Sequence, residues 1–314
     1  MQMKLLSVFS VFLIFTLERV SNFELTNTKE CQSSDHQQSP ININTNDVKY
    51  VEEKFFRILG QNFTLFNSTW KSFDEERTIG FSGTIGSLIF VKDWAMYKFD
   101  LKNVYIRYGP SHRIDGMKYD MEMEFVFDID DTYRTPGRYI HPSSEKLILS
   151  YFFVVSPDAI TNNEDDKVTL FFNYTNLEEF SKNTNTNTVW FTKNIKFNKL
   201  IKQQPSYFYE GSTTSGKCQS AWRVLMPKYQ LIPKSQYNQI RTALSNLGYL
   251  ENNNGLESNS RSLVIVNAGT QILRNEKDSS RLLIEASVDQ YDKVFGQRLD
   301  IFVFAAILAL LLLA

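Results

Sequence analysis

The sequence lacks most of the features that reveal an enzyme or a nucleic-acid-binding protein. Its 314 residues include only three histidines and two cysteines, and the net charge is −1. A balanced charge gives no overall attraction to nucleic acid or to an anionic membrane. The basic residues are scattered, so the sequence predicts no nucleic-acid partner. The glycines form no phosphate-binding loop, and no G-x-S-x-G nucleophile motif occurs.

Apolar runs of more than about ten residues occur only at the two chain ends, and neither is as long as the roughly 20 residues of a transmembrane helix. Met1–Ser21 carries Lys4, then an apolar stretch, then a small residue. This order is typical of a secretory signal peptide, and we expect cleavage near Ser21. The C-terminal run Ile301–Ala314 is shorter than the roughly 20 residues of a transmembrane helix, and no basic residue follows it.

The residues before the C-terminal run suggest a lipid anchor. Small residues at Ala286 and Ser287 precede a polar spacer, Asp289–Asp300, and then the apolar tail. Small residues, spacer and tail in this order form a glycosylphosphatidylinositol (GPI) signal. The sequence thus predicts attachment at Ala286 or Ser287, removal of residues 288–314, and a place on the outer leaflet of the plasma membrane. A short tail anchor or a terminal core helix is the alternative.

Sequons and cysteines agree with secretion. Asn62, Asn67 and Asn173 each begin an N-x-S/T sequon and are predicted glycosylation sites. Cys31 and Cys218 are the two cysteines, and an isolated pair in an oxidising compartment should be bridged. A bridge over so long a loop contributes about 4–5 kcal/mol in the chain-entropy model. Two free buried thiols are the alternative.

The fold is predicted to be strand-rich, because the chain contains 25 Phe and 15 Tyr. The segment 103–127 has the period of two strands joined by a turn. The apolar run Lys146–Val155 predicts a buried strand, and Lys234–Leu247 has the spacing of an amphipathic helix. We therefore expect a β protein with few helices.

Five stretches carry a family resemblance. Gln38–Ile43 (QSPINI) is a signature found near the start of the family's domain. A strand pair follows: Val104–Gly109 matches a first strand ending F-H-F-H-W-G, and Tyr119–Glu124 matches a second strand reading Y-x-x-E-L-H. Tyr207–Leu225 follows the block Y-x-G-S-L-T-T-P-P-C…W-x-V-L, and Asn267–Leu273 is a degraded N-x-R-P-x-Q-P-L. In this order they resemble the α-carbonic anhydrases.

The resemblance spans about Cys31–Arg274 and implies one domain over residues 22–287, with a short C-terminal stalk. The implied fold is mostly β: a large twisted, mainly antiparallel sheet with a few short peripheral helices.

The resemblance also implies a changed metal site. Tyr105, Arg107 and Glu124 stand at the three zinc-binding histidine positions. The positions behind them are Ser111, His112, Glu122, Tyr209 and Thr214, with Ser111 replacing the glutamate that normally anchors the hydroxyl of Thr214. His36, His112 and His141 cannot form a three-histidine site in this fold. We therefore expect no metal, no cofactor and no carbon dioxide hydration.

Geometry suggests what fills the metal position. Tyr105 and Arg107 share a strand face, and Glu124 should lie across from them on the antiparallel neighbour. Our hypothesis is a buried Arg107–Glu124 ion pair, completed by hydrogen bonds from Glu122 and His112. The alternative is that both charges are solvated in an open cavity.

The predicted function is non-catalytic: a carbonic anhydrase-related cell-surface protein for recognition, adhesion or assembly, whose partner is a protein or a polysaccharide. One alternative is residual hydratase or esterase activity, with metal held by Glu124, Glu122 or His112. Another is a structural subunit of a membrane-associated complex.

Overall fold

The computed structural model describes residues 38–51, 56–65, 68–82, 86–92, 95–130, 143–156, 167–183, 189–191, 195–196, 205–214, 218–253, 256–260, 263–266 and 270–275. The predicted signal peptide and anchor signal lie outside these residues, as do Cys31, Asn67, Ala286 and Ser287.

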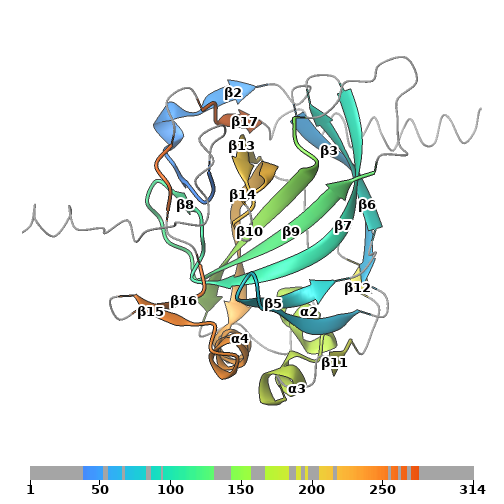
Figure 1. The fold of residues 1–314 in the computed structure, drawn as a ribbon, viewed down its shortest axis with the longest axis vertical. Helices are drawn as coiled ribbons and strands as arrows, with labels where there is room; N and C mark the ends of the chain where they lie inside the picture. The colour runs from blue at the N-terminus through green and yellow to red at the C-terminus, as the bar shows by residue number, and fades with distance from the viewer. Residues whose placement is uncertain are drawn as a thin grey trace, which may run out of the picture.

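Strands dominate the described chain, as predicted (Figure 1). The strands are β1 (Asn42–Ile43), β2 (Lys49–Val51), β3 (Phe56–Leu65), β4 (Thr69–Phe73), β5 (Thr78–Ser82), β6 (Gly86–Lys92), β7 (Ala95–Tyr108), β8 (Arg113–Ile114), β9 (Met121–Ile129), β10 (Lys146–Ser156), β11 (Val189–Trp190), β12 (Ile195–Lys196), β13 (Tyr207–Ser212), β14 (Ser220–Pro233), β15 (Glu251–Asn253), β16 (Leu256–Ser258) and β17 (Leu273–Asn275). The helices are the 3-10 turn η1 (Thr45–Asp47), α2 (Lys167–Tyr174), α3 (Leu177–Lys182) and α4 (Lys234–Asn246).

One large sheet organises the molecule. Its strand order is β11-β4-β5-β7-β9-β10-β14-β13-β17-β2, and β6 branches from β7 to continue through β3 and β12. The pairs β10–β14 and β17–β2 are parallel, and the other pairs of this sheet are antiparallel. The prediction of a large, mainly antiparallel sheet is confirmed.

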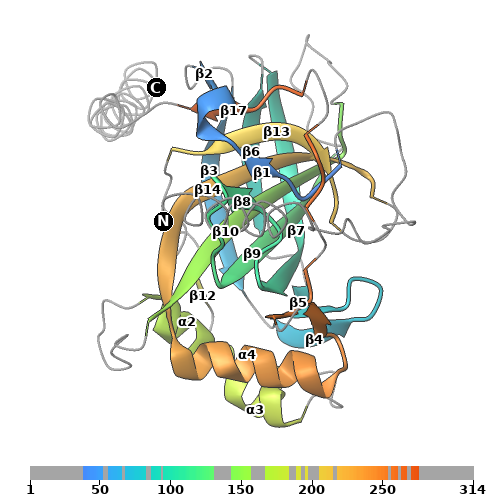
Figure 2. The same cartoon turned by 90° about the vertical axis from the view of Figure 1, so that its left-hand side faces the viewer.

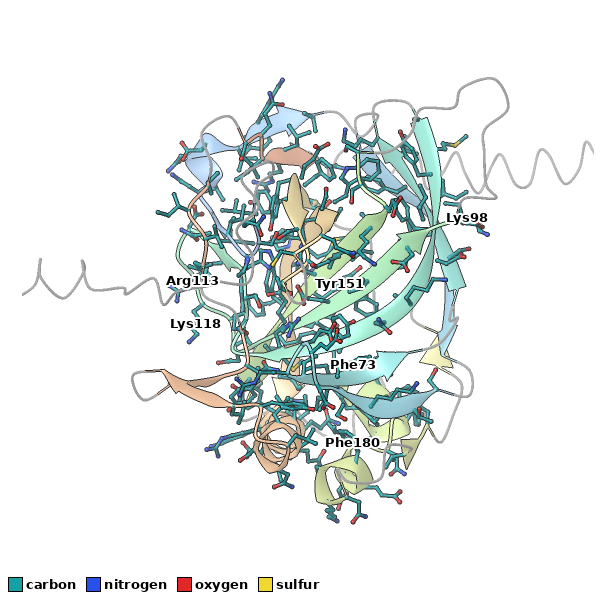
Figure 3. The ribbon with its side chains drawn as sticks, in the orientation of Figure 1. Phe73, Lys98, Arg113, Lys118, Tyr151 and Phe180 are labelled. Carbon is teal, nitrogen blue, oxygen red and sulfur yellow. The ribbon has the colours of Figure 1, made fainter. Side chains whose placement is uncertain are left out.

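The core covers one face of the sheet. Alternate residues of β9, such as Met123 and Phe125, point into the main apolar cluster. Residues of all three α-helices join the same cluster, and the helices gather at one end of the sheet (Figures 1 and 2). Phe180 of α3 stacks on Trp70 of β4 with ring centroids 5.4 Å apart, and Figure 3 labels Phe180 among these packed side chains.

The opposite face of the central strands is buried but polar. Because side chains alternate along a strand, Glu122 and Glu124 lie on the face of β9 opposite Met123. Strand β14 alternates in the same way: Trp222 packs in the apolar core, and Arg223 is fully buried on the other side. This polar face contains the candidate site.

Two segments agree closely with the sequence predictions. The apolar run from Lys146 forms β10, and the predicted amphipathic helix is α4, whose Ile240 and Leu244 are fully buried. Among the described residues, no helix is both long and apolar enough to cross a membrane.

Candidate functional site

The centre of the polar face is an ion pair between neighbouring strands. Tyr105 of β7 is paired in register with Glu124 of β9, and Arg107 with Glu122. The Nε of Arg107 donates a hydrogen bond to Oε2 of Glu124 at 2.9 Å, and these side chains are 3% and 1% exposed. The predicted Arg107–Glu124 pair is therefore present, and the alternative of two solvated charges is wrong.

A second guanidinium completes this pair. Nη1 of Arg223 donates to Oε1 of Glu124 at 2.6 Å, and the Arg223 side chain is 0% exposed. The Nε of Arg223 also donates to the carbonyl oxygen of Ser212 at 2.8 Å. We call Arg107, Glu124 and Arg223 the charge cluster.

Further hydrogen bonds fix the charge cluster in one arrangement. The hydroxyl of Thr214 donates to Glu124 at 2.9 Å and accepts from Nη2 of Arg107 at 3.1 Å. Nη1 of Arg107 donates to the carbonyl oxygen of Glu76 at 2.9 Å. A buried ion pair is tolerated when additional bonds of this kind satisfy its remaining polar atoms. Tyr105 packs beside the cluster, with its ring centroid 5.6 Å from Cζ of Arg107.

The electrostatics favour an ionised Glu124. Burial opposes ionisation, but the guanidinium groups of Arg223 and then Arg107 more than offset it, so the pKa of Glu124 lies well below its usual range. Glu124 in turn raises the pKa of Arg223, against the opposing effect of burial. Burial, and then the carboxylate of Glu76, raise the pKa of Tyr105, which keeps its hydroxyl protonated.

A separate hydrogen-bond chain lies behind the charge cluster. Glu122 accepts from the backbone N–H groups of Ser111 and His112 at 2.9 and 3.0 Å. Its Oε1 lies 2.8 Å from Nδ1 of His112, whose Nε2 lies 2.8 Å from the hydroxyl of Tyr209. That hydroxyl continues the chain to Oγ of Ser39 at 2.7 Å. Burial opposes ionisation of Glu122, but contact with His112 lowers its pKa overall.

This second chain corrects one prediction. Glu122 and His112 bond to each other and, among the described residues, supply no hydrogen bond to the Arg107–Glu124 pair. Thr214 and Arg223 supply those bonds instead. The sequence did offer a signal for Arg223, since it is an arginine within the apolar run of β14. Strand alternation alone could not indicate which face it occupies or which carboxylate it meets.

The donor atoms do not fit a zinc ion well. His112, Glu122 and Glu124 each offer an atom within 4.8 Å of the others, and all are buried. Both oxygens of Glu124 already accept hydrogen bonds from guanidinium groups, however. A divalent cation there would be close to the two positive charges of Arg107 and Arg223, and like charges at such distances repel strongly in a buried site.

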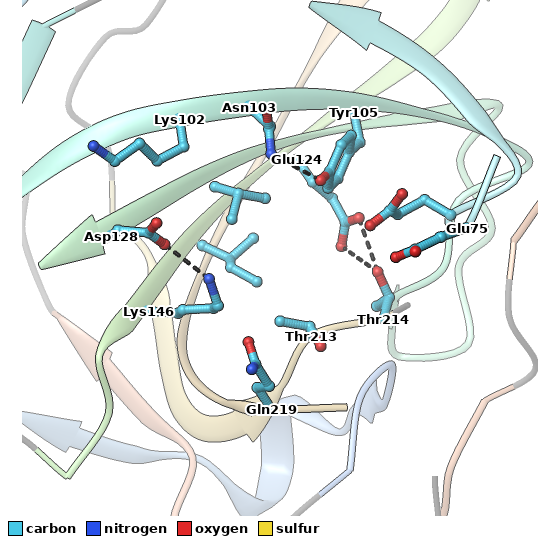
Figure 4. A pocket seen from close by; sticks show the side chains of 13 residues that line it. Glu75, Lys102, Asn103, Tyr105, Glu124, Asp128, Lys146, Thr213, Thr214 and Gln219 are labelled. Atoms are coloured by element: carbon cyan, nitrogen blue, oxygen red, sulfur yellow. Dashed lines mark hydrogen bonds and ion pairs between the residues drawn. The ribbon is translucent and has the colours of Figure 1, made fainter. Parts of the chain in front are cut away.

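A cavity of about 320 Å³ opens beside the charge cluster (Figure 4). Tyr105, Glu124 and Thr214 line it at one end, and Lys102, Asp128 and Lys146 lie across from them. Its remaining lining residues are Glu75, Glu76, Asn103, Val126, Ile148, Thr213 and Gln219.

The other predicted positions are spread over the fold. Cys218 is buried and disulfide-bonded, and Cys31, its predicted partner, lies outside the described residues. Asn173 is exposed on α2, where its Oδ1 accepts a hydrogen bond from Gln236 at 3.0 Å. Asn62 lies on β3. Glycosylation at these positions stays a prediction.

The sequence and the fold were compared with known proteins. A family model described as eukaryotic-type carbonic anhydrase matches residues 21–270. The chain belongs to the eukaryotic-type carbonic anhydrase family. No curated protein sequence matches it significantly.

Solved structures of carbonic anhydrases share this fold. The halotolerant carbonic anhydrase of Dunaliella salina aligns with a TM-score of 0.56 at 16% identity, covering 78% of this chain and 89% of that one. Dioscorin, solved in complex with ascorbate, gives 0.55 at 19% identity, covering 78% and 88%. The α-carbonic anhydrase of Thermovibrio ammonificans, solved with sulfanilamide, gives 0.51 at 20% identity, covering 76% and 86%. At these identities the likeness establishes the fold alone.

Proposed function

We propose that this carbonic anhydrase family member is non-catalytic and uses the family fold as a binding module at the cell surface. The supporting observation is the charge cluster: both oxygens of Glu124 accept from buried guanidinium groups. Hydration of carbon dioxide in the family depends on a metal-bound water whose pKa is lowered toward 7. In this protein, side-chain ion pairs take the place of that metal.

Arg107 and Arg223 each oppose metal binding at Glu124, for different reasons. Arg107 would have to leave Glu124, Thr214 and the Glu76 carbonyl together, since it donates to all three. Arg223 is fully buried and has no route to water in its present conformation. Freeing Glu124 for a metal would therefore strand two desolvated cations, which is strongly unfavourable.

The test uses the secreted protein with its C-terminal tail deleted. We expect far less than one zinc per chain by elemental analysis, and no carbon dioxide hydration above the uncatalysed rate. Dialysis against a chelator should leave the thermal midpoint unchanged. Stoichiometric zinc with turnover would overturn the proposal, and the same preparation of an active family member is the control.

A residual enzyme is the second candidate, because His112, Glu122 and Glu124 lie close enough together to bind one ion. It requires Glu124 to exchange its guanidinium partners for metal. His112→Ala would then abolish both zinc binding and activity. Loss of stability without any change in metal content would instead favour the non-catalytic function. A structural role in a membrane-associated complex is a third candidate, which co-purification tests.

The surface location rests on the chain ends. The Met1–Ser21 leader, the sequons and the tail together support secretion, with GPI attachment at Ala286 or Ser287. Phosphatidylinositol-specific phospholipase C should release the protein from intact cells. A variant lacking residues 301–314 should be secreted without treatment. Retention of the protein on phospholipase-treated cells would contradict a GPI anchor.

A further inference from the structure

The cavity beside the charge cluster has opposite charges at its two ends and an apolar floor between them. We propose that it binds a small ω-amino acid: an unbranched zwitterion with an ammonium group at one end and a carboxylate at the other. The ammonium contacts Glu75 and Glu76, and the carboxylate contacts Lys102. This inference rests on the proposed function and names the class of ligand for this site.

The acidic end is formed by the turn between β4 and β5. Glu75 and Glu76 both line the cavity, and within the described chain neither carboxylate has an ion-pair partner. Glu124 lies at the same end, but Arg107 and Arg223 neutralise it. Figure 4 shows Glu75 beside Glu124 and Thr214. The unbalanced charge at this end is therefore negative and suits an ammonium group.

The basic end is created by an irregularity in β7. The register between β7 and β9 shifts between Leu101 and Asn103, so Lys102 is the unpaired residue of a bulge. Bulges redirect side chains, and Lys102 lines the cavity. Across from it, Lys146 pairs with Asp128 at 2.8 Å, which cancels their charges. Lys102, without an ion pair among the described residues, is left to bind an anion.

An apolar strip separates the two ends. Glu124, Val126 and Asp128 follow one another on the same face of β9, and Ile148 of β10 is paired with Val126. Val126 and Ile148 belong to one small apolar cluster together with Tyr105. Glu124 marks the acidic end of this strip and Asp128 the basic end, and the four residues of β9 from one to the other span roughly 13 Å. A hydrogen-bond length of about 3 Å is used at each end of the strip. The ligand's charged groups should thus lie roughly 7 Å apart, joined by methylene groups.

Tyr105 adds a polar contact within this strip. Its side chain is 8% exposed, and its hydroxyl oxygen accepts a hydrogen bond from Nδ2 of Asn103 at 3.0 Å. The O–H proton has no acceptor among the described residues, although the hydroxyl lines the cavity. A buried donor of this kind is normally satisfied by a partner. That donor is available to a ligand or water bound in the cavity.

The experiment compares three matched sets of probes by isothermal titration calorimetry. The first contains ω-amino acids from 4-aminobutyrate to 8-aminooctanoate. The others contain the corresponding n-alkylamines and n-alkanoates, which keep one charge. We expect the five- to seven-carbon amino acids to bind best and each single-charge analogue to bind about tenfold more weakly, a difference of about 1.4 kcal/mol.

Substitutions test which residues bind the ammonium and which bind the carboxylate of the ligand. The double variant Glu75→Gln/Glu76→Gln should lower affinity for 6-aminohexanoate about tenfold and leave hexanoate binding unchanged. Lys102→Met should have the same effect on 6-aminohexanoate and leave hexylamine unchanged. The matched controls are Glu178→Gln and Lys182→Met, an exposed pair on α3. Neither control substitution should change the affinity for any probe.

Three results would overturn the inference: no binding by any probe, equal binding of amine and amino acid, or binding that the cavity variants do not alter. Zinc content is measured on the same sample. Bound zinc with turnover overturns the proposed function, whatever the probes do. A zinc-free, inactive protein that binds no probe overturns only the choice of ligand.

Discussion

Arg223 donates to Glu124 across 2.6 Å, although the two residues lie 99 positions apart in the sequence and each is almost completely buried. Glu124 is at the same time bonded to Arg107. The stability of the central sheet should therefore depend on three charges acting together, and substitutions can test this directly.

Arg107→Ala should lower the free energy of unfolding by about 3–5 kcal/mol, because buried atoms of Glu124 and Thr214 and the Glu76 carbonyl lose the donor that Arg107 supplies. Urea denaturation followed by fluorescence measures the change. The control is Lys71→Ala at an exposed position of β4, expected to shift stability by less than about 0.5 kcal/mol. Equal stability of Arg107→Ala and the wild type would contradict a structural role for the cluster.

Replacing all three charges should be less harmful than removing one. The triple variant Arg107→Met/Glu124→Leu/Arg223→Met leaves no buried charge of the cluster behind, and apolar replacements of buried ionic triads are often neutral or stabilising. We expect it to be more stable than Arg107→Ala in the same denaturation assay. A triple variant less stable than the single one would mean that hydrogen bonds, rather than charge balance, dominate.

Acid should destabilise the protein through Glu124. Its pKa in the folded state lies below the usual 4.5, so its contribution is complete above that value and is lost as the pH falls toward the folded-state pKa. The free energy of unfolding should thus decrease from about pH 5 to about pH 3. In Arg107→Ala the pKa of Glu124 moves back toward its unfolded value, so the decrease should be smaller and should level off at a higher pH. Superimposable profiles would contradict this assignment.

Gly80→Ala should disturb the sheet next to the site. Gly80 of β5 is paired with Tyr105, and a Cβ atom there would lie 1.8 Å from the carbonyl oxygen of Val104. Relieving this clash requires β5 and β7 to separate, which should cost about 1–3 kcal/mol. Thermal denaturation measures the loss. Lys71→Ala is again the control, because Lys71 is paired with Gly80 on its other side.

Reduction should weaken the fold strongly. Cys218 is disulfide-bonded, and a bridge to the distant Cys31 would contribute about 4–5 kcal/mol. Urea midpoints measured with and without dithiothreitol should differ accordingly, and Cys31→Ser/Cys218→Ser should match the reduced protein. A double variant as stable as the oxidised wild type would contradict a stabilising bridge.

Side-chain alternation and strand pairing, which can be read from short stretches of sequence, predicted part of the site. Alternation placed Tyr105 and Arg107 on one face of β7, and antiparallel pairing placed Glu124 opposite them, as the register confirms. The missing partner, Arg223, comes from a strand joined to the hairpin only through β10. Its meeting with Glu124 depends on the parallel register of β10 and β14, which no local pattern specifies.

The cavity was equally beyond local prediction. Its basic end depends on the bulge that turns Lys102 inward, and a single extra residue in a long strand leaves little signal in an alternating sequence. Its acidic end depends on how the turn after β4 packs, and Arg107 holds that turn through the carbonyl oxygen of Glu76.

The charge cluster also restricts how this sequence can evolve. Exchanging Glu124 for a neutral metal-binding side chain leaves two buried cations facing each other. Exchanging either arginine alone leaves an oxygen of Glu124 and a backbone carbonyl without the donor that the arginine supplies. Each single step therefore passes through a destabilised fold. Residues at the cavity rim lie outside the cluster and can be substituted one at a time. A return to metal binding requires several simultaneous replacements within the cluster.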